Sequence, residues 1–404
     1  MDLIIFEDKN ADGFYPLSVS HPVFDLFYGC YNIVERYRRF FKPDNICLSC
    51  REYLADVARE KYEVSVNNFD AIKNDCLLIN AALMPDVQLY NQLLNAKPDT
   101  AFISDNALIG ARLSADKFND LSAENGLLFE ADNFRSISNI IDIKDSMFKH
   151  LWDIVNYNGR AIVFDLKHIP GISSWQSSSL SKKYGSNVFV HKTAQVFDDA
   201  FIDASAGPVI IDENAVIEAR TLIQGPAYIG KNSRALAGMI REGSSLGPTC
   251  KAGGELEETI IMGCSNKAHE GFIGHAYIGE WVNLGALTTN SDLKNNYSEI
   301  QVQLNSQLIP TGSIKVGCFI GDHTKTGIGT LLNTGMAIGF CSNIYGGALF
   351  TDKEIGHFRW GTPGNLVDFK FEKAIEIAKI AMRRRDIKFT LAYEKLFKHI
   401  ADTV

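Results

Sequence analysis

Long apolar runs, a disulfide framework and an excess of positive charge are all missing from this chain, and each absence excludes a class of protein. No apolar run approaches the length of a membrane span, so we expect no transmembrane helix. Eight cysteines in 404 residues are too few for a disulfide framework. The net charge of −8 argues against nucleic acid as a partner, although local cation clusters can still bind acidic small molecules. The amino terminus lacks the basic start of a signal peptide, which favours the cytoplasm.

The first part of the chain alternates strand-like and helix-like segments. With 404 residues, 46% hydrophobic and 22% charged, the chain has the composition of a globular protein of two or three domains. Short apolar runs at 3–6, 46–48, 77–79, 101–103 and 162–164 are typical of buried strands. One helical face lies between them, formed by Cys30, Ile33, Val34, Tyr37 and Phe41. We therefore expect a doubly wound α/β domain over 1–172, followed by a serine-rich linker over 173–185.

The second half of the chain carries an aliphatic residue at every sixth position. Neither the helical period nor the strand period produces this spacing, but a left-handed parallel β-helix does, because each short strand contributes one inward side chain before a tight turn. We expect this fold over 186–350, with a protruding loop where the repeat breaks at 291–313. The repeat is formed by Val190, Val196, Ile202, Ile211, Ile217, Ile223, Ile229, Ala235, Phe272, Ile278, Leu284, Ile314, Ile320, Leu332, Ile338 and Ile344, with Thr326 as its polar member.

A helical segment is expected to follow the β-helix over 351–404. Apolar residues there recur at the spacing of one helical face, and they are Phe371, Ala374, Ile375, Ala378 and Met382. Three arginines come directly after this pattern, starting at Arg383. A solvated face and a phosphate contact are both compatible with these arginines.

A dense polar stretch marks the candidate site. It reads Ser-Asn-Lys-Ala-His-Glu-Gly-Phe-Ile-Gly-His from Ser265 and Gly-Glu-Trp-Val-Asn-Leu-Gly-Ala from Gly279. Together with the six-residue repeat, it resembles the bifunctional glucosamine-1-phosphate N-acetyltransferase / UDP-N-acetylglucosamine pyrophosphorylase family, in the variant form that lacks the usual glycine-rich loop. The resemblance implies a sugar nucleotidyltransferase-like domain, an acetyl-CoA-dependent acyltransferase domain acting on an amino-sugar phosphate in nucleotide-sugar biosynthesis, and a homotrimer.

The resemblance implies that His269 is the general base of acyl transfer. The family places its base ten residues before the glycine of an Ile-Gly hexad, as His269 precedes Gly279 here. An amino sugar is mostly protonated at neutral pH and must lose a proton before it attacks a thioester, which a histidine can accept. Acetyl-CoA is already activated, so no covalent intermediate is needed. His275 is expected to be a structural turn residue.

The same resemblance implies the residues that contact substrates. Asn283 matches a position that holds the acceptor sugar, and Glu255 matches a carboxylate of the sugar pocket. Phe272 stands where the family usually has tyrosine, so one phenolic hydrogen bond is missing. Ala286 matches a position that contacts the acetyl group, and Asp322 is expected beside it as a second acetyl-CoA contact.

Recognition of the acceptor's phosphate departs from the family pattern. The family has a lysine where this chain has Glu257, and a phosphate dianion needs charged or bidentate donors. Arg241, which matches a family arginine, and Lys251 are the candidates to supply the missing charge. If neither reaches the site, a sugar 1-phosphate binds poorly.

The amino-terminal domain is poor in the cations that nucleotidyl transfer needs. Within residues 1–35, Lys9 is the only cationic side chain. A nucleoside triphosphate such as UTP would be repelled there, unless Mg²⁺ intervenes, by Asp8, Asp12 and Asp25. Either other basic residues close over the site, or this half has lost nucleotidyl transfer and serves as a scaffold or sugar-phosphate sensor. Asn80 and Asp165, at the ends of expected strands, are the candidate metal or ribose contacts.

Two other functions are compatible with the sequence. A zinc hydrolase or carbonic anhydrase on the same β-helix would need three histidines on one metal, and the chain offers His269, His275 and His323. A non-catalytic or regulatory subunit would explain the eroded cationic sites. The presence of both His269 and Asn283 favours the enzyme.

Overall fold

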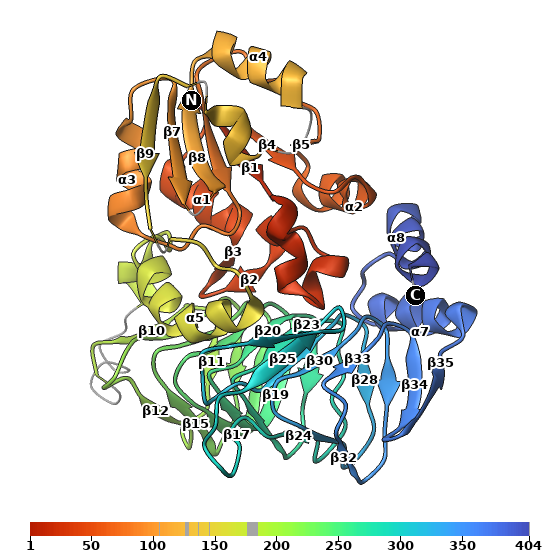
Figure 1. The fold of residues 1–404 in the computed structure, drawn as a ribbon. Helices are drawn as coiled ribbons and strands as arrows, with labels where there is room; N and C mark the ends of the chain where they lie inside the picture. Colours follow the sequence, from red (N-terminus) through yellow and green to blue (C-terminus); the bar gives the residue numbers. More distant parts are fainter. Residues whose placement is uncertain (105, 126–128, 136, 145, 176–184, 404) are drawn as a thin grey trace. The chain divides into compact units, whose positions relative to one another are not determined.

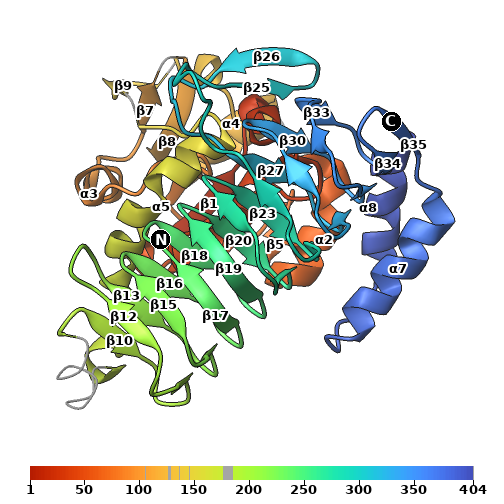
Figure 2. The same ribbon diagram turned by 90° about the horizontal axis from the view of Figure 1, so that it is seen from below.

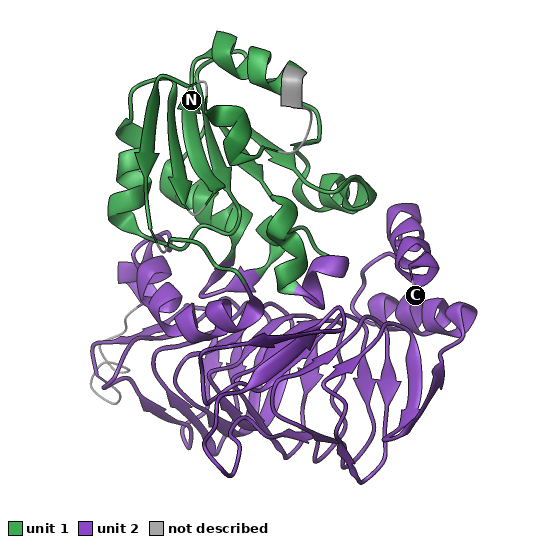
Figure 3. Cartoon of the chain, in the orientation of Figure 1, with its two compact units in different colours: residues 1–14, 21–26, 32–149 green, residues 15–20, 27–31, 150–404 purple. Residues whose placement is uncertain are grey.

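The computed structural model describes residues 1–404 apart from 105, 126–128, 136, 145, 176–184 and 404 (Figure 1). The chain forms two compact units (Figure 3). Unit 1 comprises residues 1–14, 21–26 and 32–149, and unit 2 comprises 15–20, 27–31 and 150–404. This division falls before the expected boundary at 172, and most of the expected linker lies outside the described residues.

Unit 1 is built on a seven-stranded mixed sheet in the order β5-β4-β1-β6-β8-β7-β9. β8 runs antiparallel to both of its neighbours, and the other pairs are parallel. β1 is buried along its whole length, as an aliphatic strand in the middle of a covered sheet should be. The elements are β1 (Asp2–Phe6), α1 (Ile33–Phe41), β4 (Ile46–Ser49), α2 (Glu52–Tyr62), β5 (Ser65–Val66), β6 (Cys76–Asn80), α3 (Val87–Asn95), β7 (Thr100–Ser104), β8 (Ala107–Leu113), α4 (Ala115–Asn125) and β9 (Asn139–Asp142).

Four of the five expected strands are confirmed as β1, β4, β6 and β7, but the strand expected at 162–164 is wrong. Those residues belong to α5 (Leu151–Leu166), a helix of unit 2. Three consecutive apolar residues suit a strand buried on both faces, but here Ile162 is fully buried while Val163 is 44% exposed. This one-sided burial is that of a helix lying on a surface.

Unit 2 is a left-handed β-helix of stacked three-strand coils, as expected (Figure 2). Face 1 contains β10 (Val188–Val190), β13 (Val209–Ile211), β16 (Ala227–Ile229), β18 (Ser244–Leu246), β20 (Ile260–Gly263), β23 (Tyr277–Glu280), β27 (Cys318–Ile320), β30 (Met336–Ile338) and β33 (Glu354–Ile355). Face 2 contains β11 (Gln195–Val196), β14 (Val216–Ile217), the first parts of β17 (Arg234–Ile240) and β19 (Lys251–Glu257), β21 (Asn266–Lys267), β28 (Lys325–Thr326), β31 (Asn343–Ile344) and β34 (Arg359–Thr362). Face 3 contains β12 (Phe201–Asp203), β15 (Thr221–Gln224), the last parts of β17 and β19, β22 (Phe272–Gly274), β24 (Thr289–Asn290), β29 (Leu331–Leu332) and β32 (Leu349–Phe350).

The inward column of the β-helix confirms the six-residue repeat with two exceptions. Most of its members are buried in one continuous aliphatic core, and the Thr326 hydroxyl lies 2.6 Å from that of Thr288. Phe272 is not in the core, because β22 pairs with β19 in a register that turns Ile273 inward instead. Ile314 is 50% exposed, since it lies in the insertion before β27.

The insertion and the carboxyl-terminal segment agree with the expected breaks in the repeat. The expected loop contains the antiparallel hairpin of β25 (Gln301–Leu304) and β26 (Gln307–Pro310). The β-helix continues past the expected end at 350 through β33 and β34, and β35 (Asn365–Asp368) pairs with β34. α7 (Phe371–Arg383), the expected amphipathic helix, and α8 (Leu391–Asp402) follow.

The remaining short elements are β2 (Phe27–Tyr28), β3 (Tyr31–Asn32) and 3-10 helices at Lys9–Phe14, Leu17–Val19, Val23–Asp25, Ala131–Phe134 and Ile172–Trp175. Among the described residues, none of the helices combines the length and the apolar character needed to cross a bilayer.

Candidate active site

His269 lies at the edge of the β-helix where face 2 turns into face 3. β21 ends at Lys267, the chain bends at His269, and β22 resumes at Phe272. The His269 side chain is exposed. Its backbone is held from inside the coil, because the Lys267 ammonium donates to the carbonyl oxygens of His269 and, at 3.2 Å, Gly253.

Lys267 is a residue that the sequence analysis missed. It pairs with Ala252 in the inward column and is 1% exposed. Burial lowers the pKa of Lys267 to about 8. Burying a lysine in an aliphatic column has a high desolvation cost, and its hydrogen bonds to two carbonyl oxygens offset part of that cost. They fix the bend that carries His269.

Ala286 lies at the same edge as His269, one coil further along. The Leu287 amide donates to the Glu270 carbonyl at 2.8 Å, and the Gly329 amide donates to the Ala286 carbonyl at 2.8 Å. The two bends are therefore stacked. The structure brings the expected base and the expected acetyl contact to one edge of the β-helix.

A cationic pocket of about 650 Å³ lies on face 2, between the outward side chains of the coils and helix α7. Lys251, Asn266, Asn283 and Lys325 are successive neighbours across the coils and line it. Arg384 and Arg385 line it from the end of α7, and none of the described residues that line it is acidic. The structure thus brings Lys251 and Asn283 together, in surroundings suited to phosphate groups.

Two of the pocket's cations are fixed by carbonyl and amide oxygens. The Arg385 guanidinium donates to the Thr249 carbonyl at 2.8 Å and to Asn266 Oδ1 at 2.9 Å. Lys325 Nζ donates to the carbonyls of Trp281 and His323 at 2.6 and 2.9 Å, and burial lowers the pKa of Lys325 to about 8. The arginines after α7 therefore face a pocket, which favours the phosphate-contact interpretation over a purely solvated face.

Arg241 is surrounded by carboxylates on face 3. Its guanidinium lies 3.3 Å from both Glu255 and Glu257 and 3.8 Å from Glu242. Lys315, from the insertion, contacts Glu257 at 3.1 Å. The arginine expected to bind a phosphate is thus already neutralised. Phe272 lies on the same face, paired with Glu255.

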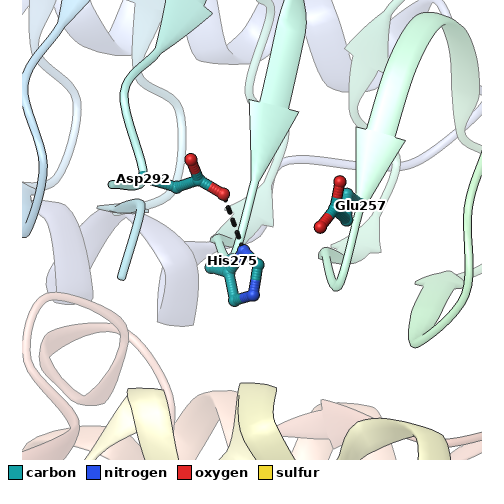
Figure 4. Close-up of side chains that lie close together, drawn as sticks. All are labelled: Glu257, His275 and Asp292. Atoms are coloured by element: carbon teal, nitrogen blue, oxygen red, sulfur yellow. Dashed lines mark hydrogen bonds and ion pairs between the residues drawn. The ribbon is translucent and has the colours of Figure 1, made fainter. Parts of the chain in front are cut away.

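The histidines do not converge on one metal. His275 Nδ1 lies 2.8 Å from Asp292 Oδ2, with Glu257 nearby (Figure 4). His323 packs instead against aromatic rings, with centroids 6.0 Å from Trp281 and 5.1 Å from Phe397. Among the described residues, the cluster of metal-ligating side chains contains neither His269 nor His323. The three-histidine alternative is wrong.

Comparison with known proteins matches the two halves of the chain separately. Residues 3–171 match the family model described as sugar nucleotidyl transferase. A bifunctional sugar-1-phosphate nucleotidylyltransferase/acetyltransferase of Sulfurisphaera tokodaii is 35% identical over 178 residues, which are 42% of each protein. The putative uncharacterized acetyltransferase YaiX of Escherichia coli (strain K12) is 30% identical over 184 residues, 45% of this chain and 80% of that protein.

The chain belongs to the GlmU-like two-domain proteins. The match spans less than half the length of the Sulfurisphaera relative, and 30% of that of a bifunctional protein GlmU of Picosynechococcus, which is 30% identical over 36% of this chain. A solved N-acyltransferase, AntD of Bacillus cereus, is 13% identical, with a TM-score of 0.26 over 52% of this chain and 98% of that one. At that score the likeness carries no argument.

Asp322 does not lie in the pocket of this GlmU-like chain. Its side chain is fully buried, and its carboxylate accepts from Ser20 Oγ at 2.8 Å and from the Glu280 amide at 2.7 Å. The expected acetyl-CoA contact is therefore wrong, because a fully buried carboxylate cannot contact a ligand. It holds the amino-terminal segment 15–20 on the β-helix.

Ion pairs lie at the ends of strands in unit 1. Glu7 follows β1, is 1% exposed, and accepts from the Arg51 side chain at 2.9 and 3.1 Å. Lys9 contacts Glu130 at 2.9 Å. Arg51 is a cation that the sequence analysis missed, and its charge is already matched.

A second ionic cluster in unit 1 surrounds Asp25. Its carboxylate contacts His21 at 2.7 Å and Lys61 at 2.9 Å, and the Tyr62 hydroxyl also donates to it. Burial alone would raise the pKa of Asp25, but Lys61 and the His21 hydrogen bond hold it well below its ordinary value. The cations that the sequence analysis sought here are therefore engaged by acidic side chains.

Asn80 and Asp165 do not form a metal or ribose site. Asn80 ends β6 as expected, but it is 1% exposed and its amide binds Asp8 and the Leu108 carbonyl at 2.9 and 3.0 Å. Asp165 is buried in α5 of unit 2, where it accepts from the Cys30 amide at 2.8 Å. Both expected nucleotide contacts are wrong, and the residues present do not fit Mg²⁺.

The segment that follows β1 is partly built into unit 2. The Phe27 amide donates to the Tyr277 hydroxyl at 2.9 Å, and that hydroxyl donates to the Phe27 carbonyl at 2.7 Å. The Gly29 amide donates at 2.6 Å to Asn158, whose amide group binds the Gly243 carbonyl at 2.7 Å. Residues 27–31, although they precede most of unit 1 in the chain, are therefore part of unit 2.

Proposed function

We propose that unit 2 transfers an acyl group, acetyl in the simplest case, from acyl-CoA to the amine of an amino-sugar phosphate such as glucosamine 1-phosphate. The observation that carries this proposal is the position of His269. It is exposed at a fixed bend, stacked below Ala286, and the adjoining strand lines a cationic pocket. The names of the bifunctional and acetyltransferase relatives support the same reaction class.

In the proposed reaction the amine nitrogen attacks the thioester carbonyl carbon, and the carbon–sulfur bond breaks. His269 accepts the proton that the amine loses and returns it to the leaving sulfur, so coenzyme A leaves as the thiol. Asn283 would hold the acceptor sugar. The pocket's cations would bind the phosphates of CoA, because four cationic side chains line the pocket and no described lining residue is acidic.

Release of thiol from acetyl-CoA by the purified chain tests this function. We expect release that depends on glucosamine 1-phosphate, with the acetylated amine as the second product. Thiol release without an amine acceptor would indicate hydrolysis and contradict the proposal.

We propose that unit 1 is a nucleotidyltransferase-like scaffold that does not transfer a nucleotide. Its described cations at the strand ends are paired with acidic side chains, so they could neutralise a triphosphate only by giving up these ion pairs. This part of the chain therefore fits the non-catalytic alternative, within a protein whose other unit is the enzyme.

We expect no pyrophosphate release from UTP and N-acetylglucosamine 1-phosphate in the presence of Mg²⁺. The same sample should release thiol from acetyl-CoA, which shows that the chain is folded. Pyrophosphate at ordinary enzymatic rates, of the order of 1 per second or more, would show that unit 1 is active.

An exposed apolar column on face 3 supports a homotrimer. The column consists of two apolar segments at outward positions of face 3, separated by the coils of Glu255 and Thr289. Phe201 and Met239 are exposed by 63% and 40% in the first segment, and Leu331 and Leu349 by 36% and 44% in the second. Exposed apolar side chains of this kind often pack against another chain, and closed symmetry would cover them on every copy.

We expect Leu331→Lys to convert the trimer to monomers, measured by size-exclusion chromatography with light scattering. A lysine there would have to be desolvated between copies. Val367→Lys, at a 54% exposed position on β35 outside the column, is the matched control and should leave the mass unchanged. A wild-type chain that is monomeric would rule the trimer out.

A further inference from the structure

We propose that Glu257, His275 and Asp292 form a divalent-cation site that takes Zn²⁺. The three side chains each offer one ligand atom, and these atoms all lie within 4.8 Å of one another (Figure 4). The inference does not depend on acyl transfer, and its test uses no substrate.

The three residues are held in place by the backbone of the β-helix. Glu257 ends β19, His275 follows β22 and Asp292 follows β24, so they come from three coils. The His275 amide donates to the Glu257 carbonyl, and the carbonyls of His275 and Asp292 accept from the Gly317 and Val316 amides, each at 2.9 Å. The side chains of the three residues are 10–14% exposed. Such a set is preorganised and still reachable from solvent.

Gly274 leaves the space that Asp292 occupies. A Cβ at this position would lie 2.8 Å from Asp292 Oδ2 and 2.4 Å from Cζ of Phe272. The strand therefore has no side chain where the carboxylate approaches His275. Close packing against a bare backbone keeps the two ligands at 2.8 Å.

The charges around the cluster do not cancel. Two cations, Arg241 and Lys315, contact it or its neighbours, against four carboxylates, Glu242, Glu255, Glu257 and Asp292. Carboxylates therefore outnumber cations here, which favours a bound metal ion.

The donor set favours zinc over magnesium. One imidazole with two carboxylates suits Zn²⁺, whereas Mg²⁺ prefers oxygen ligands alone. Three protein ligands leave a fourth position for water. Zinc ligands about 2.0 Å from the metal lie about 3.3 Å apart, so the main adjustment is a closer approach of Glu257.

Lys315 competes with the metal for Glu257. Its ammonium lies 3.1 Å from Glu257 Oε1, and its side chain is 45% exposed. Zinc binding would displace this ammonium into water, while Arg241 can remain on Oε2. Removing the lysine should therefore strengthen zinc binding, which a cluster of purely structural ion pairs would not show.

The test is zinc binding by the untagged, chelator-treated full chain, followed by calorimetry and elemental analysis. We expect one Zn²⁺ per chain, with Mn²⁺ weaker and Mg²⁺ undetected. His275→Ala and Asp292→Asn should each weaken zinc binding about 100-fold, and Lys315→Met should tighten it about tenfold. His191→Ala is the matched control, since this half-buried histidine lies outside the cluster, where it contacts Thr193 and Trp175.

Several results would overturn the site. The first two are a wild-type chain that does not bind zinc at micromolar concentration and one that binds only Mg²⁺. The other two are an unchanged zinc affinity in folded His275→Ala or Asp292→Asn, and a weaker zinc affinity in Lys315→Met. Circular dichroism establishes whether each variant is folded. If His275→Ala does not fold, Asp292→Asn alone tests the site. Thiol release by the wild type, measured separately, shows whether the proposed acyltransferase stands whatever the zinc result.

Discussion

Replacing His269 by alanine should lower kcat for acyl transfer by a factor of about 10² to 10⁴. The imidazole is exposed at the bend, and its loss leaves no side chain at this position to accept the proton of the amine. The bend itself should survive, because Lys267 binds the backbone carbonyl of residue 269 and not the ring. Thermal unfolding should therefore be nearly unchanged while thiol release from acetyl-CoA falls.

Rescue by added imidazole separates a catalytic role for His269 from a structural one. A small base that enters the vacated space should restore part of the activity of His269→Ala. His191→Ala removes a half-buried histidine elsewhere in the β-helix unit and should retain full activity. Undiminished thiol release in His269→Ala would make the proposed base wrong.

Neutralising the pocket on face 2 should raise the KM for acetyl-CoA about 100-fold in the double variant Lys251→Met, Arg384→Met. Each side chain supplies a charge-assisted contact to phosphate, and partial exposure reduces its contribution to about a factor of ten. Both line the pocket, where no acidic side chain opposes them. The KM for the amino sugar should change little if the pocket holds the phosphates of CoA.

Two controls identify which phosphate the pocket binds. Acetyl-pantetheine has no phosphate, so its KM should be the same for the double variant and the wild type. Arg383→Met removes an arginine of α7 that does not line the pocket and should leave the KM for acetyl-CoA unchanged. An increase confined to the KM for glucosamine 1-phosphate would assign the pocket to the acceptor instead.

Lys267 shows why the inward residues of a six-residue repeat cannot all be assigned from the sequence. Ile261, Lys267 and Ile273 are six residues apart, so the signal for an inward lysine was present. The sequence analysis followed Phe272 instead, because a large apolar residue is the stronger hydrophobic candidate. The pairing of β19 with β22 turned Ile273 inward. Register depends on hydrogen bonds between coils, which one coil's sequence does not contain.

The charged residues were harder to assign than the fold. Asp322 and Asp165 are both acidic residues beside apolar runs, and both are fully buried hydrogen-bond acceptors for distant backbone or side-chain groups. Their partners, Ser20 and Cys30, are far away in the chain. A position at the end of an apolar run predicts only where along a strand or helix the residue lies. Whether its side chain binds a ligand or the protein depends on the groups that the fold brings next to it.

Spacing alone was enough to specify the coiled prism and its aliphatic column, because each coil must bury one apolar side chain per strand to be stable. It also singled out His269, through the motif around it. Folding decided which charges are available: Arg241 and Arg51 are matched by carboxylates, whereas the cations beside α7 meet no acidic side chain in the pocket. Charge compensation acts across space between segments remote in the chain, and a linear pattern carries no information about such distances.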